Sequence, residues 1–351
     1  MMPAFNAERY IAQAVESVLV QSYTPWELIV VNDGSTDGTA GVLERYSDSR
    51  IKVIHQTNSG EPAARNAALD AMQGEYVAFL DADDLYLEQH LKKALERLNE
   101  CSCDGVYSDG HYCDQAGTPQ RRLSSWRRGP FEGAIFPEVV RASDVFGPPV
   151  CVVLRRDPIL KQGLRFDPRL PVGCDWDFLT RFSEHCAFAY VNDCTCLYRV
   201  HETNVTVLTS GRKRADSLAL CRENAIRLPG FLCCSAEIQN HVFYDLLVNL
   251  LPGNPARQAE TTGWPQFAGL PGAAQAKLLR LMASREIAMG RNAMYAREWL
   301  SRSRKLDRRD ARGAVLWALF AVSPRLSRWI LQCKNALSRR PARNSPFGPS
   351  V

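Results

Sequence analysis

Two patterns of apolar residues alternate along the first hundred residues, one with helical periodicity and one made of short continuous runs. Apolar positions between residues 8 and 21 recur every third or fourth place, which predicts a helix, and the apolar run 27–31 that follows predicts a buried strand. The same alternation predicts helices at 39–46, 62–72 and 87–99 and strands at 51–55, 75–80 and 105–107. Because strands and helices alternate, we expect a parallel, doubly wound α/β sheet, in which ligands bind beyond the carboxyl ends of the strands.

The pattern changes twice farther along the chain. Residues 111–207 are richer in Gly, Pro, Arg and aromatic residues, with short strand-like runs at 150–154 and 195–200, and we expect them to fold over the edge of the sheet. Helical patterns follow at 216–226, 237–251, 273–288 and 311–337. We therefore expect one domain over residues 1–207, whose two halves meet near residue 110, and a helical region over 208–351.

Composition narrows the class of protein. A chain of 351 residues with 46% hydrophobic content can bury a substantial core. It has no apolar run of about 18 residues, and its start, Met1-Met2-Pro3, lacks the features of a secretory signal, so we expect a cytoplasmic protein. The twelve cysteines do not have the spacing of a disulfide framework or a zinc site, and we expect them to be free thiols.

The net charge of +5 is unevenly distributed. Residues 301–351 hold twelve Arg or Lys and two Asp, which leaves about −5 for the rest of the chain. Apolar residues recur in this tail at helical spacing: Leu326, Trp329, Ile330, Cys333 and Leu337. Basic residues fill the positions between and after them: Arg325, Arg328, Lys334, Arg339 and Arg340. Such a helix binds an anionic membrane surface or packs on the rest of the protein. Its sequence is not typical of a nucleic-acid-binding module, so we expect no nucleic-acid partner.

Acidic residues gather where two predicted strands end. Asp81, Asp83 and Asp84 follow the apolar strand 75–80, and Asp33 follows the strand 27–31. Carboxylates this close repel one another unless a positive charge lies among them, and a divalent cation is one interpretation. The other is structural, with Asp84 capping the next helix. Both acidic segments are expected on the same edge of the sheet.

Six ordered segments resemble the inverting family 2 glycosyltransferases, which have the GT-A fold. They are PAFNAERYI (3–11), SVLVQSYTPWELIVVNDGSTDGT (17–39), NSGEPAARNAAL (58–69), GEYVAFLDADD (74–84), CDWDFLTR (174–181) and YRVHETN (198–204). The resemblance implies a mixed sheet with a Rossmann-like nucleotide-binding half and a C-terminal helical extension. It also implies a nucleotide-sugar donor, with UDP as the expected carrier, and a hydroxyl acceptor on a glycan or lipid-linked precursor. No motif of the processive polymerases is present.

The resemblance also assigns roles on the donor side. It implies that Pro3, Ala4 and Phe5 line the pocket of the base and that Asp33 hydrogen-bonds the base. Arg65 matches a basic residue near the nucleotide, with a solvated helix arginine as the alternative.

On the metal side, the resemblance makes Asp83 a direct ligand of Mn²⁺ or Mg²⁺ and places Asp81 toward the ribose or the metal shell. His201 matches a histidine near the metal and the diphosphate, and a structural role is equally open for it.

The resemblance further implies that Asp175 is the general base that takes the proton of the acceptor hydroxyl. Cys174 stands where the family commonly has Glu, which puts an acceptor contact in doubt, and Asn32 stands where it often has Asp. Trp176 stacks on a sugar or belongs to the core.

Most of the first strand expected before Pro3 is missing, and we expect the natural start to lie upstream. Two other functions remain open. One is a sugar-phosphate nucleotidyltransferase, although the Gly-rich basic loop typical of those enzymes is absent; the other is a catalytically inert nucleotide-sugar-binding module.

Overall fold

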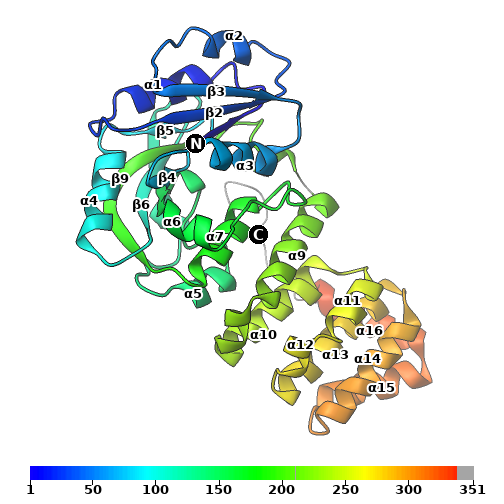
Figure 1. Ribbon diagram of the computed structural model, residues 1–351. Coiled ribbons are helices and arrows are strands. Elements are labelled where there is room, and N and C mark those ends of the chain that lie inside the picture. Colours follow the sequence, from blue (N-terminus) through cyan, green and yellow to red (C-terminus); the bar gives the residue numbers. More distant parts are fainter. Residues whose placement is uncertain (210, 338–351) are drawn as a thin grey trace. The chain divides into compact units, whose positions relative to one another are not determined.

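The computed structural model describes residues 1–209 and 211–337, and the chain divides into two compact units, Met1–Leu208 and Thr209–Val351 (Figure 1). The strands all belong to unit 1: β1 (Met2–Ala4), β2 (Leu28–Asp33), β3 (Ile51–Gln56), β4 (Tyr76–Ala78), β5 (Leu85–Tyr86), β6 (Gly105–Cys113), β7 (Pro119–Arg122), β8 (Val152–Arg155) and β9 (Phe188–Arg199). Its helices are α1 (Ile11–Leu19), α2 (Thr39–Leu43), α3 (Glu61–Ala71), α4 (His90–Glu100), α5 (Phe136–Arg141), α6 (Arg156–Lys161), α7 (Cys174–Ser183) and α8 (Val205–Leu208).

The first three strands form a parallel sheet. Strand β2 lies between β1 and β3 and is buried along its whole length, which explains its unbroken apolar run from residue 28 to 31. Helix α3 packs against β1 and β2. The carboxyl ends of β1 and β2 lie side by side, since Ala4 pairs with Asn32.

The second sheet is mixed, in the order β4-β8-β6-β9-β5. Strands β6 and β9 run parallel, and β8 runs antiparallel to both β4 and β6. Met1 connects this sheet to the first one, because its amino group donates to the Ala78 carbonyl (2.7 Å) and its carbonyl accepts from the Leu80 amide (3.1 Å). Through Met1, the short strand β1 lies between β2 and β4.

Every element predicted in the first 110 residues is present, with ends shifted by a few residues. The hydrophobic pattern alone predicted a parallel sheet, and this is wrong for β8, which runs antiparallel to β4 and β6, and for β5, which runs antiparallel to β9. The mixed sheet implied by the family resemblance is confirmed. Periodicity reports burial on both faces of a strand but carries no information on the direction of its neighbours.

Unit 2 is helical throughout its described residues. Its helices are α9 (Gly211–Arg227), α10 (Ala236–Tyr244), α11 (Pro255–Thr261), α12 (Pro265–Ala268), α13 (Gly272–Met289), α14 (Ala293–Leu306), α15 (Ala311–Val322) and α16 (Pro324–Leu337), and a π-helical segment, Asp245–Leu250, continues α10. Helix α14 was not predicted, although its Trp299 and Leu300 are fully buried. Over residues 1–209 and 211–337, no helix has the length and apolarity needed to cross a bilayer.

The basic tail forms α16, which contacts α13 and α15. Its small residue Ser327 is buried, whereas Leu326, Trp329 and Ile330 are exposed. The apolar stripe predicted in the tail therefore does not pack inside its own unit. Arg339 and Arg340, together with the side chain of Leu337, lie outside the described residues.

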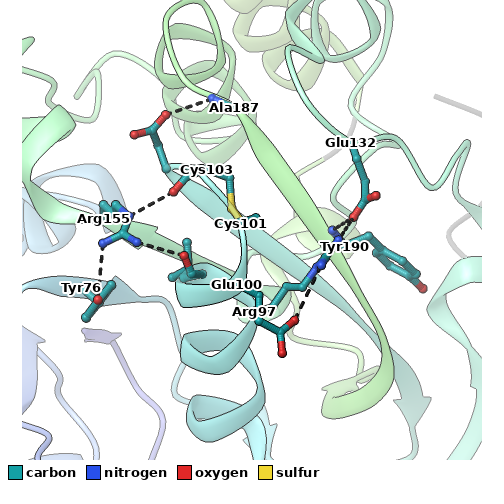
Figure 2. The surroundings of a disulfide bond; sticks show 11 residues. Tyr76, Arg97, Glu100, Cys101, Cys103, Glu132, Arg155, Ala187 and Tyr190 are labelled. Carbon is teal, nitrogen blue, oxygen red and sulfur yellow. Dashed lines mark hydrogen bonds and ion pairs between the residues drawn. A yellow bond between two sulfur atoms is a disulfide. The ribbon is translucent and has the colours of Figure 1, made fainter.

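Cys101 and Cys103 are joined in a disulfide at the end of α4, with Cα atoms 5.3 Å apart, and the expectation of twelve free thiols is wrong for this pair. Figure 2 shows its surroundings, where Arg155 donates to the Cys103 carbonyl (3.0 Å) and Arg97 pairs with Glu132 (2.7 Å). The spacing of one intervening residue carries no signal of a secreted framework, so the sequence offered no basis for this bond.

Candidate active site

The carboxyl end of β2 carries Asp33, whose side chain is buried. Its Oδ1 accepts hydrogen bonds from the Gln56 side chain (2.7 Å) and the Ser59 amide (2.9 Å), and its Oδ2 accepts one from the Gly60 amide (2.8 Å). These N–H groups replace water around a buried carboxylate. Asp33 thereby holds the segment between β3 and α3 against the end of β2.

Gly34 follows Asp33 with a φ of +71°, a conformation that side-chain-bearing residues rarely adopt. A Cβ at this position would lie only 2.6 Å from the Asn58 amide nitrogen. Asn32, which stands where the family often has Asp, accepts a hydrogen bond from the Ser35 amide (3.1 Å) through Oδ1. The turn after β2 is therefore packed directly on the segment before α3.

Helix α3 connects this turn to the acidic segment after β4. It begins at Glu61, directly after Gly60, and carries Arg65 one turn later. Through Nη2, Arg65 donates to Asp81 Oδ1 (2.7 Å) and pairs with Glu61 Oε1 (2.8 Å). Because Arg65 is 1% exposed, the alternative of a solvated helix arginine is wrong.

Burial and charge shift the pKa values in this cluster. Burial raises the pKa of Glu61 to about 7; Arg65 offsets part of this effect, and the negative charges of Asp81 and Asp175 add to it. Burial also raises the pKa of Asp81, again against the influence of Arg65. Although burial opposes it, the attraction of Glu61 and Asp81 raises the pKa of Arg65, so the guanidinium remains charged.

Asp83 faces the end of β9. Its Oδ2 is 2.8 Å from His201 Nε2 and 3.3 Å from Asn204 Nδ2. The other ring nitrogen of His201, Nδ1, is 2.8 Å from Thr203 Oγ1, and the ring packs against Tyr10 with centroids 4.8 Å apart. Asp83 and His201 are thus in direct contact, although 118 residues separate them in sequence.

Asp84 has a different role from its two neighbours. It is fully buried, and its Oδ1 accepts a hydrogen bond from the Arg199 amide (2.8 Å). Helix α4 begins only at His90, so the suggestion that Asp84 caps it is wrong. Burial, followed by the charges of Asp83 and Asp81, raises the pKa of Asp84 well above its usual range. This carboxyl fixes the end of β9 beside the acidic segment.

Asp175 is the second residue of α7. It adjoins Cys174, whose Sγ lies 3.6 Å from Arg65 Nη1 and 3.7 Å from Glu61 Oε1. The negative charge of Asp175 contributes to the raised pKa values of Glu61 and Asp81. Asp175 therefore lies in the same electrostatic environment as these two carboxyl groups.

Trp176 is buried, and its indole nitrogen donates to the Val139 carbonyl (2.9 Å). The interpretation of Trp176 as a core residue is confirmed.

The segment Pro3-Ala4-Phe5 leaves the sheet next to Asp33. Ala4 is buried beside Asn32, while the Phe5 ring is 52% exposed. The following residue, Asn6, accepts a hydrogen bond from the Thr36 amide (2.8 Å), which ties this segment to the turn after β2. Phe5 thus presents an open aromatic face close to the end of β2.

The structure brings most of the expected site residues together. Asp33 and Asp81 are connected through α3, Asp83 contacts His201, and the charge of Asp175 acts on the same cluster. Glu61 was missed, because its spacing from Arg65 resembles an ordinary ion pair within a helix. Within the part of the chain that the structure describes, no three His, Cys, Asp or Glu side chains converge closely enough to hold a metal ion by themselves.

Comparison with known proteins defines first the fold and then the family. The fold is that of crystallised S. aureus TarS residues 1–349, whose complex with UDP-GlcNAc matches with a TM-score of 0.59 at 16% identity, over 97% of this chain and 91% of that one. Residues 1–161 match the family Glycosyl transferase family 2. Over these residues the chain is similar to the family 2 glycosyltransferases, and its fold is the GT-A fold.

Curated relatives agree with this family. TuaG of Bacillus subtilis (strain 168), which is named for teichuronic acid biosynthesis, is 47% identical over 120 residues, 33% of this chain and 48% of TuaG. WfgD of Escherichia coli, named a UDP-Glc:alpha-D-GlcNAc-diphosphoundecaprenol beta-1,3-glucosyltransferase, is 36% identical over 110 residues, 31% of this chain and 44% of WfgD. The chain spans about half the length of these two relatives.

Proposed function

We propose that this protein transfers a sugar from a nucleotide sugar, with UDP as the carrier, to a hydroxyl group of a glycan or lipid-linked acceptor. The observation that carries the proposal is the connection between two acid-bearing strand ends: α3 presents Gly60 to Asp33 at one end and Arg65 to Asp81 at the other. The base would lie against Phe5 and Asp33, and the diphosphate near Arg65, Asp81 and Asp83.

The acidic segment fits a divalent cation of the Mn²⁺ or Mg²⁺ type. Such ions prefer carboxylate oxygens, and Mg²⁺ in particular is often held by one or two carboxylates together with substrate phosphates. Asp83 and Asp81 would be the protein ligands, with His201 beside them. When bound, the ion would neutralise the charge of the departing diphosphate. Among the described residues no side-chain cage is complete, and phosphate oxygens of the donor would supply the remaining ligands.

In the proposed reaction Asp175 is the general base. The acceptor hydroxyl oxygen forms a bond to the anomeric carbon as the bond to the diphosphate breaks on the opposite face, so the configuration is inverted. The hydroxyl proton moves to the Asp175 carboxylate. Arg65 holds Asp81 in place, and the Glu61 carboxyl lies between Arg65 and the start of the helix that carries Asp175.

A donor screen tests the proposal. We expect UDP or a UDP-sugar, together with Mn²⁺, to raise the melting temperature, because a ligand that binds only the native state stabilises it. Hydrolysis of that donor should fall at least about tenfold in Asp175→Asn. The matched control is Asp157→Asn, which removes an exposed carboxylate on α6. Full activity in Asp175→Asn, with the control unchanged, would remove Asp175 from its assigned role.

The exposed face of α15 and α16 fits an anionic membrane on the cytoplasmic side. Trp329 is 62% and Val322 86% exposed, and Trp317 is also exposed. Arg325 and Lys334 are on the same pair of helices. Aromatic and aliphatic side chains enter the headgroup region while basic side chains bind anionic lipids. A lipid-linked acceptor would then be close to the enzyme.

Sedimentation with vesicles tests this surface. The full chain should sediment with vesicles of phosphatidylglycerol and phosphatidylcholine, and several-fold less with phosphatidylcholine alone. Trp329→Asp should weaken binding, whereas Met294→Asp, at an exposed apolar position on α14, should not. Equal binding by the two variants would exclude α16 as the contact.

A further inference from the structure

Arg121 contacts two aromatic rings on the surface of unit 1. The central carbon of its guanidinium is 5.1 Å from the centre of the Tyr112 ring and 4.9 Å from that of Trp126. Arg121 belongs to β7, and Trp126 ends the 3₁₀ turn Leu123–Trp126. We call Tyr112, Arg121 and Trp126 the arginine shelf. A guanidinium that meets rings through its faces keeps the N–H groups along its edge for hydrogen bonds.

The charge of this segment is only partly used within the protein. Residues 119–128 contain four arginines and no acid. Arg127 and Arg128 are held by carbonyl and carboxylate groups of neighbouring segments. Arg122 has its nearest carboxylate at 4.0 Å. Among the residues that the structure describes, no carboxylate pairs with Arg121, so the shelf carries uncompensated positive charge.

The shelf adjoins the candidate active site. Tyr112 on β6 pairs in register with Tyr198 on β9, and their rings are 6.0 Å apart. Three residues after Tyr198 is His201, which contacts Asp83. Both tyrosines also pack against the hydrophobic cluster that includes Ala82, the residue between Asp81 and Asp83. The shelf therefore lies near the carboxyl end of β6, beside the end of β9 that leads to His201.

We infer that the arginine shelf binds an anionic sugar of the acceptor glycan. The inference rests on the proposed function and specifies its acceptor class. The edge of Arg121 suits a carboxylate or phosphate, which it can bind through two parallel N–H groups. Trp126 is 44% exposed and offers an apolar face of the kind on which a sugar ring packs. A neutral acceptor would leave the positive charge without a partner.

The combination of groups favours a glycan over a lipid diphosphate. Binding of a diphosphate requires positive charge alone, whereas the shelf combines the arginine with two aromatic rings, of which Trp126 is exposed. An anionic sugar has both a charged group and an apolar ring face. It therefore uses every part of the shelf.

Calorimetry with matched oligosaccharides tests the inference. The probes are oligogalacturonate, its neutral methyl ester, and an oligomer of glycerol phosphate, which separates carboxylate from phosphate recognition. We expect the full chain to bind at least one anionic probe roughly tenfold more tightly than the ester, and to lose this preference at about 1 M salt, where charges are screened within about 3 Å. Equal affinity for acid and ester would overturn the inference.

Variants locate the binding. Arg121→Ala and Trp126→Ala should each weaken the preferred anionic probe about fivefold or more, a change within the range measured for exposed charge and aromatic contacts. Lys92→Ala is the matched control, because it removes one exposed positive charge from α4. Arg121→Lys keeps the charge but loses the planar fork, and should recover binding only in part. Binding by Arg121→Ala that equals the control would contradict the assignment.

Two further measurements separate the possible failures. UDP binding by the unmodified chain reports on the proposed function: if UDP binds and no anionic probe does, the shelf is wrong while the donor site stands. If UDP does not bind, the proposed function itself fails. Farnesyl diphosphate serves as a lipid diphosphate probe. If it binds in an Arg121-dependent manner and the oligosaccharides do not, the choice of a glycan is wrong.

Discussion

Strand β2 ends in Asp33 and the segment after β4 contains Asp83, and the two carboxylates have different surroundings. Asp33 is buried and accepts three hydrogen bonds from groups of its own chain, two of them from backbone amides. Asp83 contacts side chains only, His201 and Asn204. A carboxylate bound to backbone amides fixes the chain, whereas one that faces movable side chains can exchange them for a ligand. Under the proposed function, the same residue type would contribute to stability in one place and to binding in the other.

The largest expected effect tests the contribution of Asp33 to stability. Asp33→Ala leaves three partly buried hydrogen-bond donors without their acceptor, and each such loss costs about 1 kcal/mol. We expect urea unfolding to show a loss of about 3 kcal/mol in the free energy of unfolding. Asp157→Ala, at an exposed position on α6, is the control and should change stability by less than about 1 kcal/mol. A stable Asp33→Ala protein would show that the segment before α3 is held by other contacts.

The second-largest expected effect tests the proposed binding role of Asp83. Asp83→Ala should lower metal-dependent donor hydrolysis at least about tenfold, equivalent to about 1.4 kcal/mol. Stability should change little, because the Asp83 side chain is partly exposed and His201 keeps its contact with Thr203. If Asp83→Ala destabilised the protein as much as Asp33→Ala did, the two strand ends would not differ in role.

The smallest effect concerns Glu61, which lies between the two strand ends. Its pKa of about 7 in the folded protein is above the ordinary value of 4.5, so the stability linked to its protonation is complete below about pH 4.5 and is lost as the pH rises through about 7. Glu61→Gln cannot ionise. Relative to the unmodified chain, it should therefore gain about 1 kcal/mol between pH 5 and pH 8, a figure reduced for partial solvent exposure.

Chemical unfolding of both proteins at several pH values measures this difference. Glu16→Gln, an exposed substitution on α1, is the control and should show a constant difference across the same range. A constant difference for Glu61→Gln as well would mean that Glu61 has an ordinary pKa.

The sequence predicted the elements of the first half and most of the site, and the reasons are local. Asp81 and Asp83 were found because they follow a buried strand, and Asp33 because it ends one. Glu61 was missed because its pairing with Arg65 resembles an ordinary ion pair within a helix, and Asp84 was misread because its partner, Arg199, lies more than a hundred residues away. Helix α14 was also not predicted, although its buried residues Ala296, Trp299, Leu300 and Ser303 recur at helical spacing.

Asp33 also restricts the length of the connection between β3 and α3. Two of its hydrogen bonds come from adjacent amides at Ser59 and Gly60, and a third comes from the last residue of β3. Surface connections usually accept insertions at small thermodynamic cost. Here one added or deleted residue between β3 and α3 would put different amides opposite the carboxylate and would displace the start of α3, and Arg65 with it. The length of this connection is therefore expected to be as restricted as the identity of any residue in it.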